Sequence, residues 1–431
     1  MENSLTLDVE RPVAGGRMLA RHDGRIVLVS GAIPGERVRA RVERTTRSVL
    51  WAEATEILQP SDDRRVPAQD PACGGALYTH VQYPRQLQLK SAVIADAFHR
   101  IGKLDLPAAP EVSASPETGY RLRARLHVRG RQVGFFREGS HVICEAGPTR
   151  QLHGEAMTAI DALAAGLGDQ LADCDGLVVS ENVAATERVL HVLPRAGRRL
   201  EHLRLSVDRL PHVTGVTIAT PDAPLALDGR GVVTDTAAEL FGGESPVPGA
   251  VSWTRNPASF FQANRFLIGA LVRRVLAAGS ADHCVDLYAG VGLFAVALAA
   301  QGSRVVAVEG DEAGARDLLM NAGPWGDRLR VAHAAVEGFL RRYDGPRPGA
   351  LVLDPPRTGV SPEALAEVIR WGVPRVVYVS CDPPTLARDA ARLTAAGYSL
   401  ESVDAFDLFP NTPHVEVVAV LGTRPLHPNR H

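Results

Sequence analysis

The chain has 431 residues, of which 45% are hydrophobic and 22% charged, and its formal net charge is −2. This size and composition are typical of a soluble globular protein with two to four domains. They exclude a membrane-spanning chain, because no long apolar run is present, and a strongly basic nucleic-acid binder at the level of the whole chain. The first residues lack the pattern of a secretory signal, so a cytoplasmic protein is expected.

Residues 1 to about 60 predict a small β-barrel. Short apolar or alternating runs at residues 5–9, 26–29, 38–42 and 51–57 are separated by glycine-containing turns. Several short strands in so few residues fit an OB-like barrel, a fold that often binds single-stranded nucleic acid. The alternative is a barrel that only packs against its neighbour. The polar segment 60–65 is expected to be a linker.

Residues 65 to about 250 predict a central α+β region. A helical segment at residues 86–101 precedes short strands, in which Arg121, Arg123 and Arg125 alternate with apolar residues. On a strand, this spacing places three guanidinium groups on one face. That face either contacts the phosphates of a nucleic acid or is simply solvated.

Residues from about 251 to 431 alternate strand-like and helical runs. Strands are expected at residues 284–287, 304–308, 350–353, 375–380 and 415–421. This rhythm predicts βαβ units and a parallel sheet that is covered by helices on both faces. The protein is therefore expected to be of the α/β class with three parts, at residues 1–60, 65–250 and 251–431.

A glycine-rich turn at residues 288–292 follows the first of these strands, and Glu309 ends the second. Glycines let the backbone approach a ligand closely, and an acid at this place can accept both hydroxyls of a ribose. A dinucleotide such as NAD would fit the same pattern. Two details favour S-adenosylmethionine: Asp286 lies before the turn, where it can face an ammonium group, and the context that cradles a diphosphate is missing.

Two later strands end in proline-rich polar segments, Asp-Pro-Pro-Arg at 354–357 and Cys-Asp-Pro-Pro at 381–384. Prolines stop a strand and suit the first turn of a helix. In an open α/β sheet, ligands bind at the carboxyl ends of the strands. A lone cysteine is commonly a small core residue. At this edge, however, the thiol of Cys381 is predicted to be a nucleophile.

Five motifs occur in order along the second half of the chain. They are Ser-Phe-Phe-Gln-Ala-Asn at 259–264, the turn within 286–294, Asp-Pro-Pro-Arg-Thr-Gly at 354–359, Ser-Cys-Asp-Pro at 380–383 and Pro-Asn-Thr-Pro-His-Val-Glu at 410–416. Together they resemble the RNA 5-methyluridine (uracil-C5) methyltransferase family. The resemblance implies an N-terminal TRAM domain at 1–60, a central RNA-recognition domain at 65–250, and a Rossmann-like S-adenosylmethionine-dependent catalytic domain at 251–431.

The same resemblance implies an activity and a set of site residues. The protein would methylate carbon 5 of a uridine in transfer or ribosomal RNA. Cys381 would be the nucleophile and Glu416 the general base, and S-adenosylmethionine would be contacted by Gln262, Tyr288, Glu309 and Asp354.

The reaction explains why a thiol and a base are needed. Carbon 5 of uracil is a poor nucleophile until a thiolate adds to carbon 6, and a base must later remove the carbon 5 proton. We expect the pKa of Cys381 to be lowered by a helix starting at Pro383 and by Arg357. His414 is the alternative base. Phe260 and Phe261 are candidates to stack on a flipped base, although at least one is expected to be a core residue.

The chain departs from the family at its cysteines. Many relatives hold an iron–sulfur cluster with four cysteines, part of them in a Cys-Gly-Gly-Cys motif. Here residues 73–76 read Cys-Gly-Gly-Ala and the next thiol is Cys144. Two thiols cannot supply four thiolates, so neither a cluster nor another metal is expected. The five cysteines are scattered, which argues for a reducing compartment and against a disulfide framework.

Two other functions stay open. One is an S-adenosylmethionine-dependent methyltransferase that acts on another nucleobase position, such as an exocyclic amine. An enzyme that methylates an exocyclic amine needs no nucleophilic cysteine. The other is a non-catalytic RNA-binding factor, against which an intact Cys381 and Glu416 argue. RNA is the expected partner, a monomer the expected state, and no membrane contact is expected.

Overall fold

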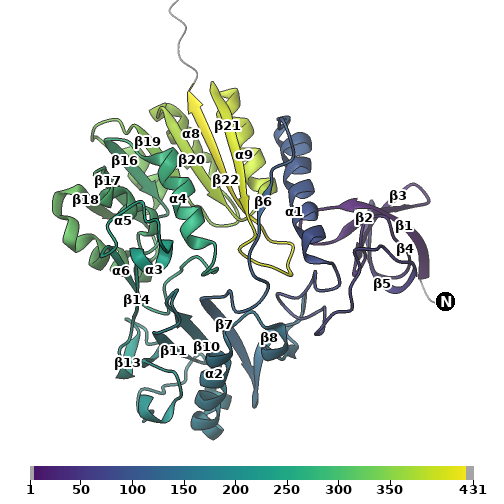
Figure 1. Ribbon diagram of the computed structural model, residues 1–431, viewed down its shortest axis with the longest axis horizontal. Helices are drawn as coiled ribbons and strands as arrows, with labels where there is room; N and C mark the ends of the chain where they lie inside the picture. Colours follow the sequence, from purple (N-terminus) through teal and green to yellow (C-terminus); the bar gives the residue numbers. More distant parts are fainter. Residues whose placement is uncertain (1–3, 424–431) are drawn as a thin grey trace, which may run out of the picture.

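The computed structural model describes residues 4–423, which begin with a closed five-stranded barrel (Figure 1). Buried side chains alternate with exposed ones along its first strand, as in Leu7 and Val9, so one face of each strand fills the barrel. The predicted OB-like barrel is confirmed. Its strands are β1 (Ser4–Pro12), β2 (Met18–His22), β3 (Arg25–Ser30), β4 (Arg37–Thr45) and β5 (Val49–Gln59).

The central region is built on a seven-stranded sheet with the order β13-β12-β11-β10-β7-β8-β9. Helix α2 (Gly154–Leu167) packs on this sheet through Ala156, Ile160 and Leu163. Short helical turns η2 (Gly147–Thr149), η3 (Gly168–Asp173) and η4 (Val207–Arg209) connect its parts. The strands are β7 (Arg123–Arg129), β8 (Gln132–Phe136), β9 (Ile143–Cys144), β10 (Cys174–Glu181), β11 (Arg188–Pro194), β12 (Gly215–Ile218) and β13 (Leu225–Gly229).

An eight-stranded sheet forms the C-terminal part, with the order β18-β17-β16-β19-β20-β22-β21-β6. Strands β16 to β20 run parallel to one another, as predicted. The strands are β6 (Val112–Ser113), β16 (His283–Leu287), β17 (Arg304–Glu309), β18 (Leu329–His333), β19 (Ala350–Leu353), β20 (Arg375–Ser380), β21 (Tyr398–Phe406) and β22 (Glu416–Thr423).

The expectation of a purely parallel sheet was wrong at one side. β22 runs antiparallel to both β20 and β21. The connection between β21 and β22 is a short loop at residues 407–415 without a helix, so the chain can only reverse direction there. As a consequence, the start of β22 lies at the same edge of the sheet as the ends of the parallel strands.

Helices cover both faces of this sheet. One face packs against α4 (Ile268–Gly279), α5 (Leu293–Ala300) and α6 (Glu312–Ala322). The other packs against α1 (Tyr83–Ala97), α7 (Val336–Arg342), α8 (Pro362–Trp371) and α9 (Pro383–Ala395). Within residues 4–423, no helix combines the length and the apolar character that a bilayer span requires.

Besides strand β6, two further segments that precede residue 251 in the chain belong to this C-terminal core. The first is α1 with the π-helical turn η1 (Phe98–Gly102), whose residues Ile94 and Phe98 pack under the sheet. The second is β14 (Val233–Thr236) with α3 (Ala237–Phe241). β14 pairs with β15 (Ser252–Arg255), and α3 packs through Leu240. The turn η5 (Gly323–Arg328) completes the elements of the part that the structure describes.

Candidate active site

A cavity of about 430 Å³ opens at the carboxyl-end edge of the C-terminal sheet. All six residues that the sequence predicts for the site line it: Gln262, Tyr288, Glu309, Asp354, Cys381 and Glu416. Four of them end or follow the parallel strands β16, β17, β19 and β20, and Glu416 begins the antiparallel β22. Gln262 comes from the loop between β15 and α4. The topology therefore brings together residues that are far apart in the chain.

The glycine turn forms one wall of the cavity. Tyr288, Gly290 and Gly292 have positive φ angles of 63°, 56° and 90°. A Cβ at Gly292 would lie 2.7 Å from the Cδ1 atom of Leu318, so a side chain there would require Leu318 to move. The backbone of the turn is thus held close to the cavity, with α5 beginning directly behind it.

Glu309 is oriented by the same turn. Its carboxylate accepts hydrogen bonds from the backbone N–H of Gly290 at 2.7 Å and of Asp311 at 2.6 Å. These bonds hold the carboxylate at the end of β17, beside the glycine turn. The remaining lone pairs of the two oxygens are the acceptors that a ligand at this wall would meet.

Asp354 and Asp286 add two more carboxyl groups beside the cavity. The side-chain amide of Gln262 donates to Asp354 at 3.1 Å, while burial raises the pKa of Asp354 to about 7. Asp286 is fully buried and does not line the cavity. Burial and the nearby Asp354 raise its pKa, and within residues 4–423 neither of its carboxylate oxygens has a hydrogen-bond partner. This concentration of acids favours a cation in the cavity.

The thiol of Cys381 follows β20 and precedes α9, which begins at Pro383 as predicted. The expected lowering of its pKa is wrong, because burial and the carboxyl group of Glu416 raise the pKa of Cys381 to about 11. Arg357 acts in the opposite direction but is outweighed. The first turn of α9 is capped by Asp382, whose carboxylate accepts from the N–H of Thr385 at 2.9 Å. That capping acid reduces the positive potential that the helix end offers the sulfur.

Glu416 is 3% exposed and lies next to the thiol in the sheet register, because Ser380 pairs with Val417. Burial and the charge of Asp354 raise the pKa of Glu416 well above its usual value. The alternative base, His414, does not line the cavity. Burial and the positive charge of Arg357 lower its pKa to about 4.

The aromatic residues of the site divide into a core residue and an exposed one. Phe261 is 4% exposed and packs under the guanidinium group of Arg255, which lies 3.8 Å from the ring centre. Phe260 is 64% exposed and lines the cavity. The expectation that one of the two is a core residue is confirmed. Phe409 also lines the cavity, although it was not predicted as a site residue; the only sequence signal for it is its position just before the Pro-Asn-Thr-Pro motif.

The three arginines of the central region do not form a free cationic face. Arg121 precedes β7 and donates to the side-chain oxygen of Gln151 at 2.6 Å. Arg123 donates to the backbone oxygen of Pro257 at 2.9 Å, and burial lowers its pKa to about 10. Arg125 forms an ion pair with Asp175. These guanidinium groups are therefore already engaged within the protein.

The expectation of no disulfide was also wrong. Cys73 and Cys144 are bonded to each other. The backbone N–H of Gly74 donates to the oxygen of Phe136 on β8, and β9 pairs with β8, so the two cysteines are brought side by side. Cys174 and Cys284 are free and buried. Within residues 4–423, no group of three or more histidine, cysteine or acidic side chains is arranged to hold a metal ion.

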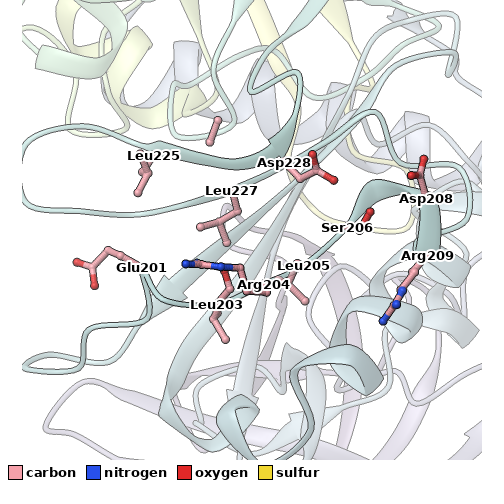
Figure 2. A pocket seen from close by; sticks show the side chains of 11 residues that line it. Glu201, Leu203, Arg204, Leu205, Ser206, Asp208, Arg209, Leu225, Leu227 and Asp228 are labelled. Carbon is pink, nitrogen blue, oxygen red and sulfur yellow. The ribbon is translucent and has the colours of Figure 1, made fainter.

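A second cavity, of about 750 Å³, lies in the central region between residues 201–209 and β13 (Figure 2). Figure 2 shows leucine side chains and charged groups of both signs around it. None of the six predicted site residues lines it. The carboxylate of Asp228 there accepts from the backbone N–H of Val207 at 2.9 Å, so it has a structural role.

Models of known protein families match the N-terminal barrel and the C-terminal region of the chain. Residues 250–424 match the family model of tRNA (uracil-5-)-methyltransferases, and residues 4–55 match the TRAM domain. The 23S rRNA (uracil(1939)-C(5))-methyltransferase RlmD of Alkalilimnicola ehrlichii is 34% identical, over 94% of this chain and 93% of that protein. The protein of the same name from Pseudomonas putida is also 34% identical, over 96% of this chain and 92% of the relative.

A solved structure has the same fold over nearly the whole length. It is the Pyrococcus abyssi tRNA (uracil-54, C5)-methyltransferase in complex with S-adenosyl-L-homocysteine, with a TM-score of 0.73 at 23% identity. The likeness covers 96% of this chain and 99% of that one. It confirms the predicted arrangement of a barrel, a central domain and a Rossmann-like sheet. On the sequence identity to its full-length relatives, the chain belongs to the RNA (uracil-C5) methyltransferase family.

Proposed function

We propose that this protein transfers the methyl group of S-adenosylmethionine to carbon 5 of a uridine in RNA, with Cys381 as nucleophile and Glu416 as general base. One observation carries the proposal. The thiol and the buried carboxyl group share a single cavity with the glycine turn and with Glu309. A nucleophile, a base and a nucleoside-binding wall are the parts that this reaction needs.

The residues of the cavity fit the cofactor. Its volume of about 430 Å³ is of the size of small-molecule and cofactor sites. Glu309 would accept the ribose hydroxyls, and Tyr288 with the glycine turn would contact the nucleoside part. Gln262 and Asp354 would hold the end that carries the amino acid and the sulfonium. When bound, the cofactor supplies an electrophilic methyl group and a positive charge, and the acids around the cavity complement that charge.

The protein's own groups then act on the uracil ring. The thiol of Cys381 gives its proton to solvent, and the sulfur forms a bond to carbon 6 of the ring. The ring electrons move toward the carbonyl oxygen at position 4, and carbon 5 becomes nucleophilic. The amide of Gln262, or a backbone N–H, would donate a hydrogen bond to that oxygen.

Glu416 completes the reaction. After carbon 5 has received the methyl group it still carries its hydrogen. The carboxylate of Glu416 accepts that proton, the bond between sulfur and carbon 6 breaks, and the thiolate is released. A carboxyl group whose pKa is raised by burial is a stronger base than an exposed glutamate, which suits the removal of a carbon-bound proton.

The uridine has to leave its stack to reach this cavity. Phe260 stands exposed at the cavity and offers a ring face to the flipped base. The relatives at 34% identity are named for 23S rRNA and the solved neighbour for tRNA, so both RNA classes enter the test.

The test is a map of 5-methyluridine by mass spectrometry in ribosomal and transfer RNA from cells with and without this protein. We expect one site to lose its methyl group and to regain it from wild-type protein but not from Cys381→Ala. Methylation of an exocyclic amine, or full activity of Cys381→Ala, would establish the alternative methyltransferase. RNA binding without any methyl transfer would establish the non-catalytic factor.

A further inference from the structure

Asn411 lies at the centre of a tight turn in the loop that joins β21 to β22. The backbone N–H of Thr412 donates to the oxygen of Phe409 at 3.2 Å, and this bond closes a β-turn with Pro410 and Asn411 in its middle. The φ angle of Asn411 is 64°, and a positive φ is what the third residue of a type II turn requires. Asparagine adopts this left-handed backbone more readily than most residues that carry a side chain. The turn sets the direction in which the chain enters β22.

Three residues from the first part of the chain hold this turn. The side-chain oxygen of Gln86, on α1, accepts from the backbone N–H of Asn411 at 2.9 Å, and its nitrogen donates to the side-chain oxygen of Asn411, also at 2.9 Å. Arg65 donates to the same side-chain oxygen at 2.7 Å. The N–H of Tyr78 donates to the backbone oxygen of Asn411 at 2.8 Å. Gln86 is fully buried and Asn411 is 8% exposed, so these bonds lie in a region of low dielectric constant, where they are strong.

Helix α1 contacts the loop at a second point. Lys90, one turn after Gln86 on the same face of α1, donates to the backbone oxygen of Phe409. Figure 1 shows α1 between the barrel and the C-terminal sheet. Because α1 is packed into the core under the sheet through Ile94, it is a fixed support for the loop. The β-turn is therefore attached to α1 at Phe409 and at Asn411.

The turn determines the place of two residues of the active-site cavity. Phe409 begins the turn and Glu416 follows it, and both line the cavity. The segment between them is restrained as well, because the hydroxyl of Thr412 accepts from the N–H of His414 at 3.2 Å and donates to the oxygen of Phe409 at 2.7 Å. A displacement of the turn would therefore move the carboxyl group of Glu416, whereas Cys381 follows β20 and is held by other elements.

We propose that Asn411 is a positioning residue for the step in which Glu416 removes the proton from carbon 5. The inference rests on the proposed function. In that step the proton passes to the carboxylate, the electron pair of the C–H bond forms the double bond between carbons 5 and 6, and the bond from carbon 6 to sulfur breaks with its pair on the sulfur. A misplacement of about 1 Å can slow a reaction about a hundredfold, so a looser turn should slow proton removal more than it slows attack by Cys381.

The test follows two quantities that separate this step from the earlier ones. Total RNA from cells that lack the protein is mixed with each variant and with S-adenosylmethionine that carries a tritiated methyl group. The release of methylated RNA gives kcat and KM, and a denaturing gel gives the fraction of protein bound covalently to RNA. Asn411→Ala loses the side-chain bonds to Gln86 and Arg65 and disfavours the positive φ. It should lower kcat about tenfold without raising KM, and it should raise the covalent fraction.

Two further variants test the cause of this effect. Asn411→Asp keeps the side-chain oxygen and tolerates the positive φ, so it should restore most of kcat. Asn182→Ala is the matched control, because Asn182 is also buried and its side-chain oxygen accepts from the N–H groups of Thr186 and Glu187 in a turn of the central region. This control should lower the stability of the protein without raising the covalent fraction.

The outcomes separate the positioning role from the proposed function. A wild-type protein that transfers no methyl groups to this RNA would overturn the proposed function and the inference with it. Methylation by wild type, together with an unchanged covalent fraction for Asn411→Ala, would overturn the positioning role alone. If Asn411→Ala fails to fold, Asn411→Gly decides, since glycine keeps the turn and removes only the side-chain bonds. Its covalent fraction should also rise, and a wild-type value would refute the inference.

Discussion

Lys90 of α1 and Asp407 form an ion pair in which both side chains are fully buried. The Nζ atom of Lys90 also donates to the backbone oxygen of Phe409 at 3.1 Å. Asp407 begins the loop that joins β21 to β22, and this loop contributes Phe409 to the cavity and ends at Glu416. A helix from the region before residue 250 thus holds one wall of the candidate active site in place.

Replacing this lysine should be costly for stability. Lys90→Met leaves the carboxylate of Asp407 buried without its partner, which destabilises a protein by about 3–5 kcal/mol. The measurement is urea denaturation followed by circular dichroism. The double variant Lys90→Met with Asp407→Asn removes both charges and should recover part of the loss. A single variant as stable as wild type would show that the pair is dispensable.

Alkylation of Cys381 should report its raised pKa. Because the pKa is about 11, the thiol is protonated at pH 7 to 8 in the cofactor-free protein. Its reaction with iodoacetamide should be slow there and should accelerate about tenfold per pH unit up to that value, since the thiolate is the reactive form. Mass spectrometry of the peptide that contains Cys381 gives the rate of alkylation. The variant Cys381→Ala serves as the control for alkylation of Cys174 and Cys284.

Addition of S-adenosylmethionine should shift the same alkylation profile to lower pH. The positive charge in the cavity offsets the effect of Glu416 and Asp354 on the thiol. The product S-adenosylhomocysteine, which lacks the sulfonium charge, is the matched control and should shift the profile less. Equal profiles with both compounds would argue against the electrostatic origin of the raised pKa.

Glu416→Gln should trap the protein on its RNA. The amide cannot accept the carbon 5 proton, so the bond between sulfur and carbon 6 persists after methyl transfer. A slowly migrating band on a denaturing gel is the expected readout. The double variant Cys381→Ala with Glu416→Gln should lack this band. Normal turnover by Glu416→Gln would assign the base to another group.

Two alanine substitutions in the glycine turn should differ in effect. At both Gly290 and Gly292 the positive φ is unfavourable for alanine, which costs about 1 kcal/mol. Only at Gly292 does the added Cβ also clash with Leu318, at 2.7 Å, whereas at Gly290 no atom lies within 4 Å. Calorimetry with S-adenosylhomocysteine should show a loss of affinity of tenfold or more for Gly292→Ala and a smaller loss for Gly290→Ala. Similar losses would mean that the clash is relieved by movement of Leu318.

Local sequence patterns were sufficient for the barrel and for the parallel strands whose ends carry the motifs, whereas the set of six predicted site residues came from the resemblance to a family. The reason is geometric. A residue that follows a parallel strand reaches the same edge of the sheet whatever the rest of the chain does, so Asp354 and Cys381 could be placed from their own segments. The direction of β22 could not be predicted in this way. It depends on the length of the loop that follows β21, and the sequence pattern did not predict β21.

Only the tertiary structure decided the electrostatics and the long-range pairs. The pKa of Cys381 is set by burial and by Glu416, which a separate strand brings next to the thiol. In the same way, nothing in the sequence indicates that Lys90, one of two lysines in the chain, forms an ion pair with Asp407. The residues next to a strand in the sequence determine where the strand ends. The electrostatic free energy of a charged group, in contrast, is a sum over all groups near it in the folded protein, and these come from the whole chain.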